Sequence, residues 1–250
     1  MSDPTARTHF GFREVASVDK QQLVGQVFSS VARRYDVMND LMSLGIHRLW
    51  KRHFIATAGL RPGDRVLDLA GGSGDISLLM AGQVGPEGLV VLSDINAQML
   101  AVGRDRVLDA GASARIACAR INAEALPFAD RSFDVVTIAF GLRNVTDKLQ
   151  ALKEMRRVLK LGGRALVLEF SALRAPLLKP LYDLYSFKVL PWLGQRIAGD
   201  ADSYRYLAES IRRHPDQEAL AELLREAGLD LVKFRSLSAG LVAIHSGVAA

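Results

Sequence analysis

The stretch that points most clearly to a chemical function is residues 65–75, which read Arg-Val-Leu-Asp-Leu-Ala-Gly-Gly-Ser-Gly-Asp. A short apolar run ends at Gly71, Gly72, Ser73 and Gly74, and an amphipathic run follows. This pattern predicts a strand, a glycine turn and a helix. Glycines let a ligand approach the main chain closely, and the helix N-terminus behind them offers free N–H groups. We therefore expect the turn to hold a nucleotide-like cofactor, with a turn that binds nothing as the plainer alternative.

The residues around the turn distinguish between two cofactor classes. A dinucleotide-binding turn has the pattern G-x-G-x-x-G, and here Ser77 stands where the third glycine belongs. Asp68 and Asp75 flank the turn, and added negative charge disfavours a pyrophosphate. The same charge suits S-adenosyl-L-methionine, because its sulfonium and α-ammonium groups are both positive. The turn therefore favours S-adenosylmethionine over a nicotinamide dinucleotide.

Two later positions fit an adenosine ligand. Asp94 follows the second predicted strand, residues 89–92, roughly 20 residues past the glycine turn, where an acid can accept hydrogen bonds from a ribose diol. Asn122 follows the third predicted strand, residues 114–119. Its amide and the backbone N–H of Ala123 are placed to bind the edge of an adenine, although a solvent-facing turn would also explain them.

Candidate catalytic residues follow the fourth predicted strand, residues 133–140. Ligands of open α/β sheets bind beyond the carboxyl ends of the strands, which places Arg143 and Asn144 on the reactive edge. A guanidinium keeps its proton, so Arg143 suits the stabilisation of an anion better than the role of a base. A surface salt bridge is the plainer explanation of Arg143. The weaker candidates are Asp202, Tyr204 and His214.

The elements that must position these residues alternate regularly between strand and helix. A fifth strand at residues 164–170 completes a series of parallel βαβ units. Residues 231–237 and 241–245 predict two further strands, and their short link makes them antiparallel. The chain is therefore expected to form an α/β fold with a mostly parallel, seven-stranded sheet and a C-terminal antiparallel hairpin.

The two remaining regions are predicted to be helical additions. We expect a loose arm at residues 1–18 and a helix at 20–35, within an N-terminal helical cap of residues 1–60. Residues 61–250 then form the catalytic domain, with a helical insertion at 171–214. Its residues 172–199 are apolar, aromatic and basic at once. Such a stretch is typical of a core helix, a lid over an apolar substrate or a contact with a membrane surface.

Composition limits the classes of protein that remain. The chain has 250 residues, of which 49% are hydrophobic and 24% charged, so it can bury the core of one α/β domain. It has no apolar run of about 18 residues, and Cys118 is its single cysteine, so we expect a cytoplasmic protein without disulfides or a metal site. The net charge of +5 is compatible with an anionic membrane or with RNA, and salt-dependent RNA affinity would favour the latter.

Beside these arguments, motifs across nearly the whole chain resemble the ubiquinone/menaquinone biosynthesis C-methyltransferases. The glycine turn is common to many methyltransferases. Among the other motifs, those at residues 35–50 and 200–206 are much more specific to this family. The other motifs are Tyr35-Asp36-Val37-Met38-Asn39-Asp40 with Gly45-Ile46-His47-Arg48-Leu49-Trp50, then Asn122-Ala123-Glu124-Ala125-Leu126-Pro127, Phe140-Gly141-Leu142-Arg143-Asn144-Val145-Thr146-Asp147, Leu166-Val167-Leu168-Glu169-Phe170-Ser171 and Asp200-Ala201-Asp202-Ser203-Tyr204-Arg205-Tyr206.

The resemblance implies a class I S-adenosylmethionine-dependent methyltransferase with a Rossmann-like fold. It implies methylation of a ring carbon of a polyprenylated quinol, which is 2-polyprenyl-6-methoxy-1,4-benzoquinol, demethylmenaquinol or both. It also implies cofactor contacts at Ser73, Asp94, Asn122 and Ala123.

On this resemblance we expect Arg143 to stabilise the quinol phenolate and Asn144 to orient the substrate or a water molecule. We also expect peripheral contact with the cytoplasmic face of a membrane through residues 172–199. No nucleic acid partner is expected, and a homodimer or a quinone-biosynthesis complex fits the same resemblance. A methyltransferase acting on another lipid or phenol is the alternative.

Overall fold

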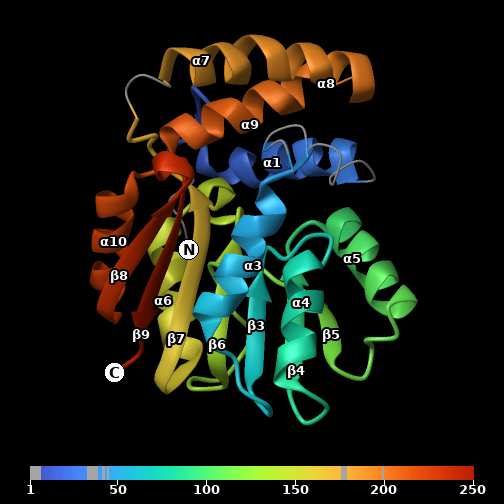
Figure 1. Cartoon of the computed structure of the whole chain (residues 1–250), viewed down its shortest axis with the longest axis vertical. Helices are drawn as coiled ribbons and strands as arrows, with labels where there is room; N and C mark the ends of the chain where they lie inside the picture. Colours follow the sequence, from blue (N-terminus) through green and yellow to red (C-terminus); the bar gives the residue numbers. More distant parts are fainter. Residues whose placement is uncertain (1–6, 33–38, 41–42, 44, 176–178, 199) are drawn as a thin grey trace.

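A seven-stranded sheet forms the centre of the computed structural model, which describes residues 7–32, 39–40, 43, 45–175, 179–198 and 200–250 (Figure 1). The strand order is β5-β4-β3-β6-β7-β9-β8. The neighbouring strands β5, β4, β3, β6 and β7 are parallel to one another, and β9 is antiparallel to both of its neighbours, β7 and β8. This confirms the predicted sheet. The strands are β3 (Arg65–Leu69), β4 (Leu89–Asp94), β5 (Ile116–Arg120), β6 (Phe133–Ala139), β7 (Leu159–Phe170), β8 (Asp230–Leu237) and β9 (Val242–Val248).

Helices cover both faces of the sheet, so its central strands are apolar on both sides. α3 (His47–Ala58), α4 (Asp75–Val84) and α5 (Ala97–Asp109) contribute to one core, and α6 (Lys148–Val158) and α10 (Gln217–Glu226) to the other. Successive strand residues alternate between the two cores: Val66 lies in the first and Leu67 in the second. Asn96 caps the start of α5, because its side chain accepts hydrogen bonds from the backbone N–H groups of Gln98 and Met99.

A layer of helices, here called the lid, lies across the carboxyl ends of the strands (Figure 1). α1 of this layer packs against α9 and α5, and α9 packs against the short helix η2 (Leu142–Asn144), which follows β6. α8 lies on the outer side of α9. The lid consists of α1 (Ser17–Val31), α7 (Lys179–Leu184), η4 (Tyr185–Val189), α8 (Leu190–Ala198) and α9 (Ala201–Arg213).

The N-terminus differs from the predicted loose arm. β1 (Arg7–Phe10) and β2 (Arg13–Ala16) form an antiparallel hairpin, and α1 begins directly after it at Ser17. The two strands are only four residues long and Phe10 is their one buried residue, so they lack the buried run by which a strand is recognised in a sequence. Residues 33–35 at the end of the predicted first helix lie outside the described residues.

Two predicted boundaries can be compared with the structure: the start of β7 and the end of the N-terminal cap. β7 begins at Leu159, five residues before the predicted start, because Gly162 and Gly163 lie within an irregular part of the strand rather than at a helix end. α3 falls inside the predicted cap of residues 1–60, yet its Trp50 and Phe54 belong to the core beneath the sheet. A domain boundary at residue 60 stays a prediction.

Candidate cofactor and active site

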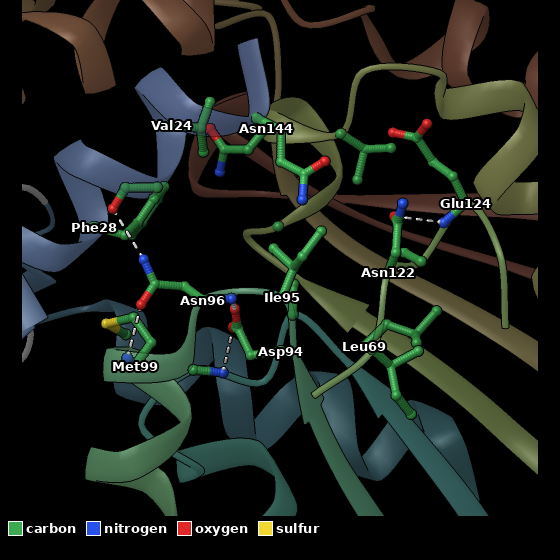
Figure 2. A pocket seen from close by; sticks show the side chains of 18 of the residues that line it. Val24, Phe28, Leu69, Asp94, Ile95, Asn96, Met99, Asn122, Glu124 and Asn144 are labelled. Atoms are coloured by element: carbon green, nitrogen blue, oxygen red, sulfur yellow. Dashed lines mark hydrogen bonds between the residues drawn. The ribbon is translucent and has the colours of Figure 1, made fainter. Parts of the chain in front are cut away.

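A cavity lies beyond the carboxyl ends of β3, β4 and β6, under α1 of the lid (Figure 2). In Figure 2, Asp94 and Asn96 lie below Phe28 and Val24 of α1. The lining is largely apolar, with a few polar groups on the loops. It consists of Gln21, Val24, Gly25, Phe28, Leu69, Ala70, Gly72, Asp94, Ile95, Asn96, Met99, Ile121, Asn122, Ala123, Glu124, Phe140, Gly141, Asn144, Val145 and Thr146.

The glycine turn is shaped by a close approach of α5. Gly72 has a φ of +55°, a conformation that side chains other than glycine rarely adopt. A Cβ on Gly103 of α5 would lie 2.5 Å from the carbonyl oxygen of Gly72, so the helix backbone packs directly on the turn. Gly103 was absent from the predicted site. Its signal in the sequence is a lone glycine inside an otherwise regular helix.

Asp94 joins the turn to the start of α5. Its carboxylate accepts hydrogen bonds from the backbone N–H of Gly72 at 3.0 Å and of Asn96 at 2.8 Å (Figure 2). Burial raises the pKa of Asp94 to about 6, and these N–H donors oppose the rise. Each carboxylate oxygen keeps a second lone pair. Asp94 therefore lines the cavity, with acceptor capacity left for a ribose diol.

Asp68 and Asp75, whose charges favoured a cationic ligand in the sequence argument, do not line the cavity. Asp68 lies behind the turn, where Ser77 Oγ and Thr137 Oγ1 donate hydrogen bonds to it at 2.6 and 2.8 Å. Burial raises the pKa of Asp68 to about 6. Asp75 faces α3, with Lys51 Nζ at 2.7 Å. The carboxylates that do line the cavity are those of Asp94 and Glu124.

The loop after β5 supplies the other predicted cofactor contacts. Asn122 and Ala123 both line the cavity, and Asn122 Oδ1 accepts a hydrogen bond from the backbone N–H of Glu124 at 3.0 Å (Figure 2). Glu124 Oε1 in turn accepts one from the backbone N–H of Thr146 at 2.9 Å. This chain of contacts fixes the loop after β5 to the loop after β6.

Backbone geometry is unusual where β3 and β6 end. Ala70 and Phe140 have φ angles of +50° and +54°, and both residues line the cavity. A Cβ on Gly141 would lie 2.5 Å from the Cβ of Ala70, so the two strand ends are in contact. Left-handed conformations at residues other than glycine cost energy and cluster at functional sites. This geometry brings η2 to the edge of the cavity.

The two predicted catalytic residues of η2 differ in their position relative to the cavity. Asn144 lines the cavity, and Tyr206 Oη of α9 donates a hydrogen bond to Asn144 Oδ1 at 3.0 Å. Arg143 is outside the lining: its Nη1 donates to Glu169 Oε1 at 2.7 Å and to the carbonyl oxygen of Phe140 at 2.6 Å. Arg143 is therefore ion-paired, but with a buried partner rather than at the surface.

The structure thus brings five of the predicted residues together around one cavity: Gly72, Asp94, Asn122, Ala123 and Asn144. Gly71, Ser73 and Gly74 belong to the glycine turn and Arg143 to η2, but they do not line the cavity, and neither do Tyr204 and His214. Asp202 is almost fully exposed. The roles of all these residues stay predictions.

The fold is similar to that of solved S-adenosylmethionine-dependent methyltransferases. A crystal structure of a methyltransferase of this kind from Aquifex aeolicus is similar with a TM-score of 0.58, at 17% identity over 80% of this chain and 89% of that one. A second, from Thermotoga maritima and described as a possible histamine N-methyltransferase, has a TM-score of 0.64, at 19% identity over 90% and 99% of the chains. At sequence identities this low, the two comparisons show a shared fold and nothing about the substrate.

The chain belongs to the ubiE/COQ5 methyltransferase family, whose model matches residues 16–249. Among its relatives is a protein of Xanthomonas campestris pv. campestris that is 65% identical over 240 residues, or 96% of this chain and 95% of the relative. A protein of Xylella fastidiosa (strain M23) is 63% identical over 98% of this chain and 97% of its own. Both are named ubiquinone/menaquinone biosynthesis C-methyltransferase UbiE. Among the described residues, none of the helices is both long and apolar enough to cross a membrane.

Proposed function

We propose that this enzyme methylates a ring carbon of a polyprenylated quinol: 2-polyprenyl-6-methoxy-1,4-benzoquinol, demethylmenaquinol or both. The observation that carries the proposal is the identity of 65% to a UbiE protein over almost the full length of both chains. Full-length identity at this level covers the cavity and the lid together, so it concerns the substrate side as well as the cofactor side.

The cavity residues fit the cofactor of this enzyme class. When bound, S-adenosylmethionine supplies a methyl group on a positively charged sulfur, which makes that methyl group electrophilic. In this proposal Asp94 holds the ribose, and Asn122 with the N–H of Ala123 holds the adenine; all three residues line the cavity. The carboxylates of Asp94 and Glu124 favour a ligand with positive charge. Phe28, Ile95 and Met99 supply apolar surface around the same space.

The chain must also stabilise the negative charge that makes a quinol ring carbon nucleophilic. That charge develops on the ring oxygen when the hydroxyl group loses its proton. Asn144 lines the cavity and follows Arg143 in sequence. Burial raises the pKa of Tyr206, and the nearby Arg143 guanidinium acts against this rise. Hydrogen-bond donors and cations in a dry site stabilise an anion more strongly than they do in water. In this proposal Asn144 supplies the direct contact, and Arg143 supplies a nearby cation whose charge is partly compensated by Glu169.

The lid is the proposed route for the apolar tail. Four large apolar side chains of the lid and the hairpin are more than half exposed: Phe12 (51%), Val18 (57%), Leu184 (55%) and Trp192 (56%). Arg213 lies over the ring of Phe12, and Arg196 lies over the ring of Trp192. Apolar side chains beside cations suit an anionic membrane surface. Leu177 and Leu178, which belong to the same predicted contact, lie outside the described residues.

Competition between substrates tests this function. The enzyme is given S-adenosylmethionine with equal amounts of a short-tailed 6-methoxy-1,4-benzoquinol, a demethylmenaquinol analogue and a prenylated monophenol. We expect methylation of one or both quinols at a kcat/KM well above that of the monophenol. Preferred methylation of the monophenol would indicate that the substrate is another phenolic lipid rather than a quinol.

A further inference from the structure

Tyr206 holds the Asn144 amide from the side away from the cavity. Tyr206 is buried and belongs to α9, and it does not line the cavity. Its hydroxyl group lies 3.0 Å from Asn144 Oδ1. Burial raises the pKa of Tyr206 well above its ordinary value, with the charge of Glu169 acting in the same direction and that of Arg143 against it. The phenol is therefore neutral at physiological pH and can donate its proton to the amide oxygen.

This contact determines which end of the Asn144 amide a ligand meets. An amide has an oxygen that only accepts and an NH2 group that only donates. Tyr206 occupies the oxygen, and no described residue accepts a hydrogen bond from Asn144 Nδ2. The group left for the cavity is therefore a pair of N–H donors. Such donors bind an acceptor, and they bind an oxyanion best.

Tyr206 is itself held in place by the N-terminal hairpin. The ring of Phe10 in β1 stacks on the ring of Tyr206, with centroids 4.1 Å apart and an interplanar angle of 17°. Both rings belong to a small core with Val27 of α1 and Leu207 of α9. The backbone N–H of Phe12 also donates to Glu209 Oε2 of α9 at 3.0 Å. The phenol therefore has little freedom to leave Asn144.

We propose that Tyr206 is a positioning residue that keeps the Asn144 N–H donors directed at an oxyanion of the substrate. This rests on the proposed function, in which the oxyanion is the phenolate of a quinol. A neutral hydroxyl group could also accept from the amide, but a phenolate gains more from two N–H donors. Tyr206 thus favours the ionised form of the substrate without touching it.

A double-mutant cycle tests whether Tyr206 acts through Asn144. The variants are Tyr206→Phe, Asn144→Ala and the two combined. The measured quantities are the Kd for 4-nitrophenolate on the enzyme saturated with S-adenosylhomocysteine, and kcat/KM for the quinol that the wild type methylates. We expect Tyr206→Phe to weaken nitrophenolate binding and lower kcat/KM by about three- to tenfold, the range of one hydrogen bond. In the Asn144→Ala background the same change should have no further effect.

The variant Asn144→Asp sharpens the test. It keeps an acceptor for the Tyr206 hydroxyl group but replaces the N–H donors with an oxygen. We expect it to weaken nitrophenolate binding more than Tyr206→Phe does, and the Kd for S-adenosylmethionine measured with all variants should distinguish this loss from damage to the cofactor site.

Several outcomes would overturn the positioning role. These are an equal effect of Tyr206→Phe in both Asn144 backgrounds, no effect of it on nitrophenolate, or unchanged binding in Asn144→Asp. Because nitrophenolate binding requires no methyl transfer, a wild type that binds nitrophenolate with the expected cycle but methylates no quinol would refute the proposed substrate alone.

Discussion

Arg143 and Glu169 form a buried ion pair directly beneath the active-site edge. Nη1 of Arg143 lies 2.7 Å from Oε1 of Glu169, and their side chains are 3% and 1% exposed. Glu169 also accepts hydrogen bonds from the backbone N–H groups of Arg143 and Phe170. The pair therefore fixes the conformation of η2 relative to the end of β7.

Removing the carboxylate should destabilise the fold strongly. Glu169→Ala leaves the Arg143 guanidinium buried without its counterion, which typically costs about 3–5 kcal/mol. We expect a fall of this size in the free energy of unfolding, measured by urea denaturation. Asp202→Ala is the matched control, because that carboxylate is almost fully exposed and its removal should change the stability little. A loss below about 1 kcal/mol for Glu169→Ala would contradict the structural role of the pair.

Cofactor affinity should depend on pH through Asp94. The pKa of Asp94 is raised to about 6 by burial. Below this pH the carboxyl group is protonated and becomes a poorer acceptor for ribose hydroxyl groups. We therefore expect the Kd for S-adenosylmethionine to be about tenfold higher at pH 5 than at pH 7.5 if binding requires the ionised form.

Asp94→Asn provides the control for that titration. It should bind the cofactor weakly at every pH, with no change between pH 5 and 7.5, when measured by isothermal calorimetry. Asp68 has a pKa raised to about 6 as well, but it lies behind the turn. A pH dependence that persists in Asp94→Asn would show that another group, such as Asp68, is responsible.

Two helical glycines permit a matched test of the glycine turn. A Cβ on Gly103 would meet the carbonyl oxygen of Gly72 at 2.5 Å, whereas a Cβ on Gly82 of α4 would have nothing within 4 Å. We expect Gly103→Ala to displace the turn and weaken S-adenosylmethionine binding by at least about tenfold, with a loss of about 1–3 kcal/mol in stability. Gly82→Ala should keep the affinity and gain up to about 1 kcal/mol. Equal affinities of the two variants would refute the role given to this helix contact.

Membrane contact through the lid can be tested with exposed leucines at two ends of the molecule. Leu184 in the lid and Leu161 in β7 are 55% and 62% exposed. We expect Leu184→Ser combined with Trp192→Ser to reduce sedimentation with vesicles containing anionic phospholipid. Leu161→Ser should not reduce the sedimentation, because the start of β7 lies at the end of the molecule opposite the lid (Figure 1). Equal sedimentation of all variants and the wild type would argue against a membrane-facing lid.

The sheet could be predicted from the sequence because each strand carries its own local signal. The apolar runs at β3, β4 and β6 and the acid at the end of β4 are contiguous patterns. Ser77, which breaks the dinucleotide pattern, is explained by the structure as a buried donor to Asp68. The β1–β2 hairpin was missed because its stability comes from Phe10 on Tyr206, a contact between residues far apart in the chain.

The site was harder to predict where side chains depend on distant partners. Position in the sequence places both Arg143 and Asn144 at the carboxyl edge of β6, but it does not give their directions. Glu169 turns Arg143 away from the cavity, and Tyr206 holds Asn144 at it. Glu124 was not among the predicted site residues, because the sequence does not show that its carboxylate accepts a hydrogen bond from the distant N–H of Thr146.

The most direct test of the central claim is to locate the transferred methyl group. The enzyme is incubated with S-adenosylmethionine carrying a 13C-labelled methyl group and with each short-tailed quinol, and the product is analysed by NMR and mass spectrometry. We expect a single labelled methyl group bonded to a ring carbon next to a ring hydroxyl. A label on a ring oxygen, or cofactor binding without transfer to either quinol, would contradict it.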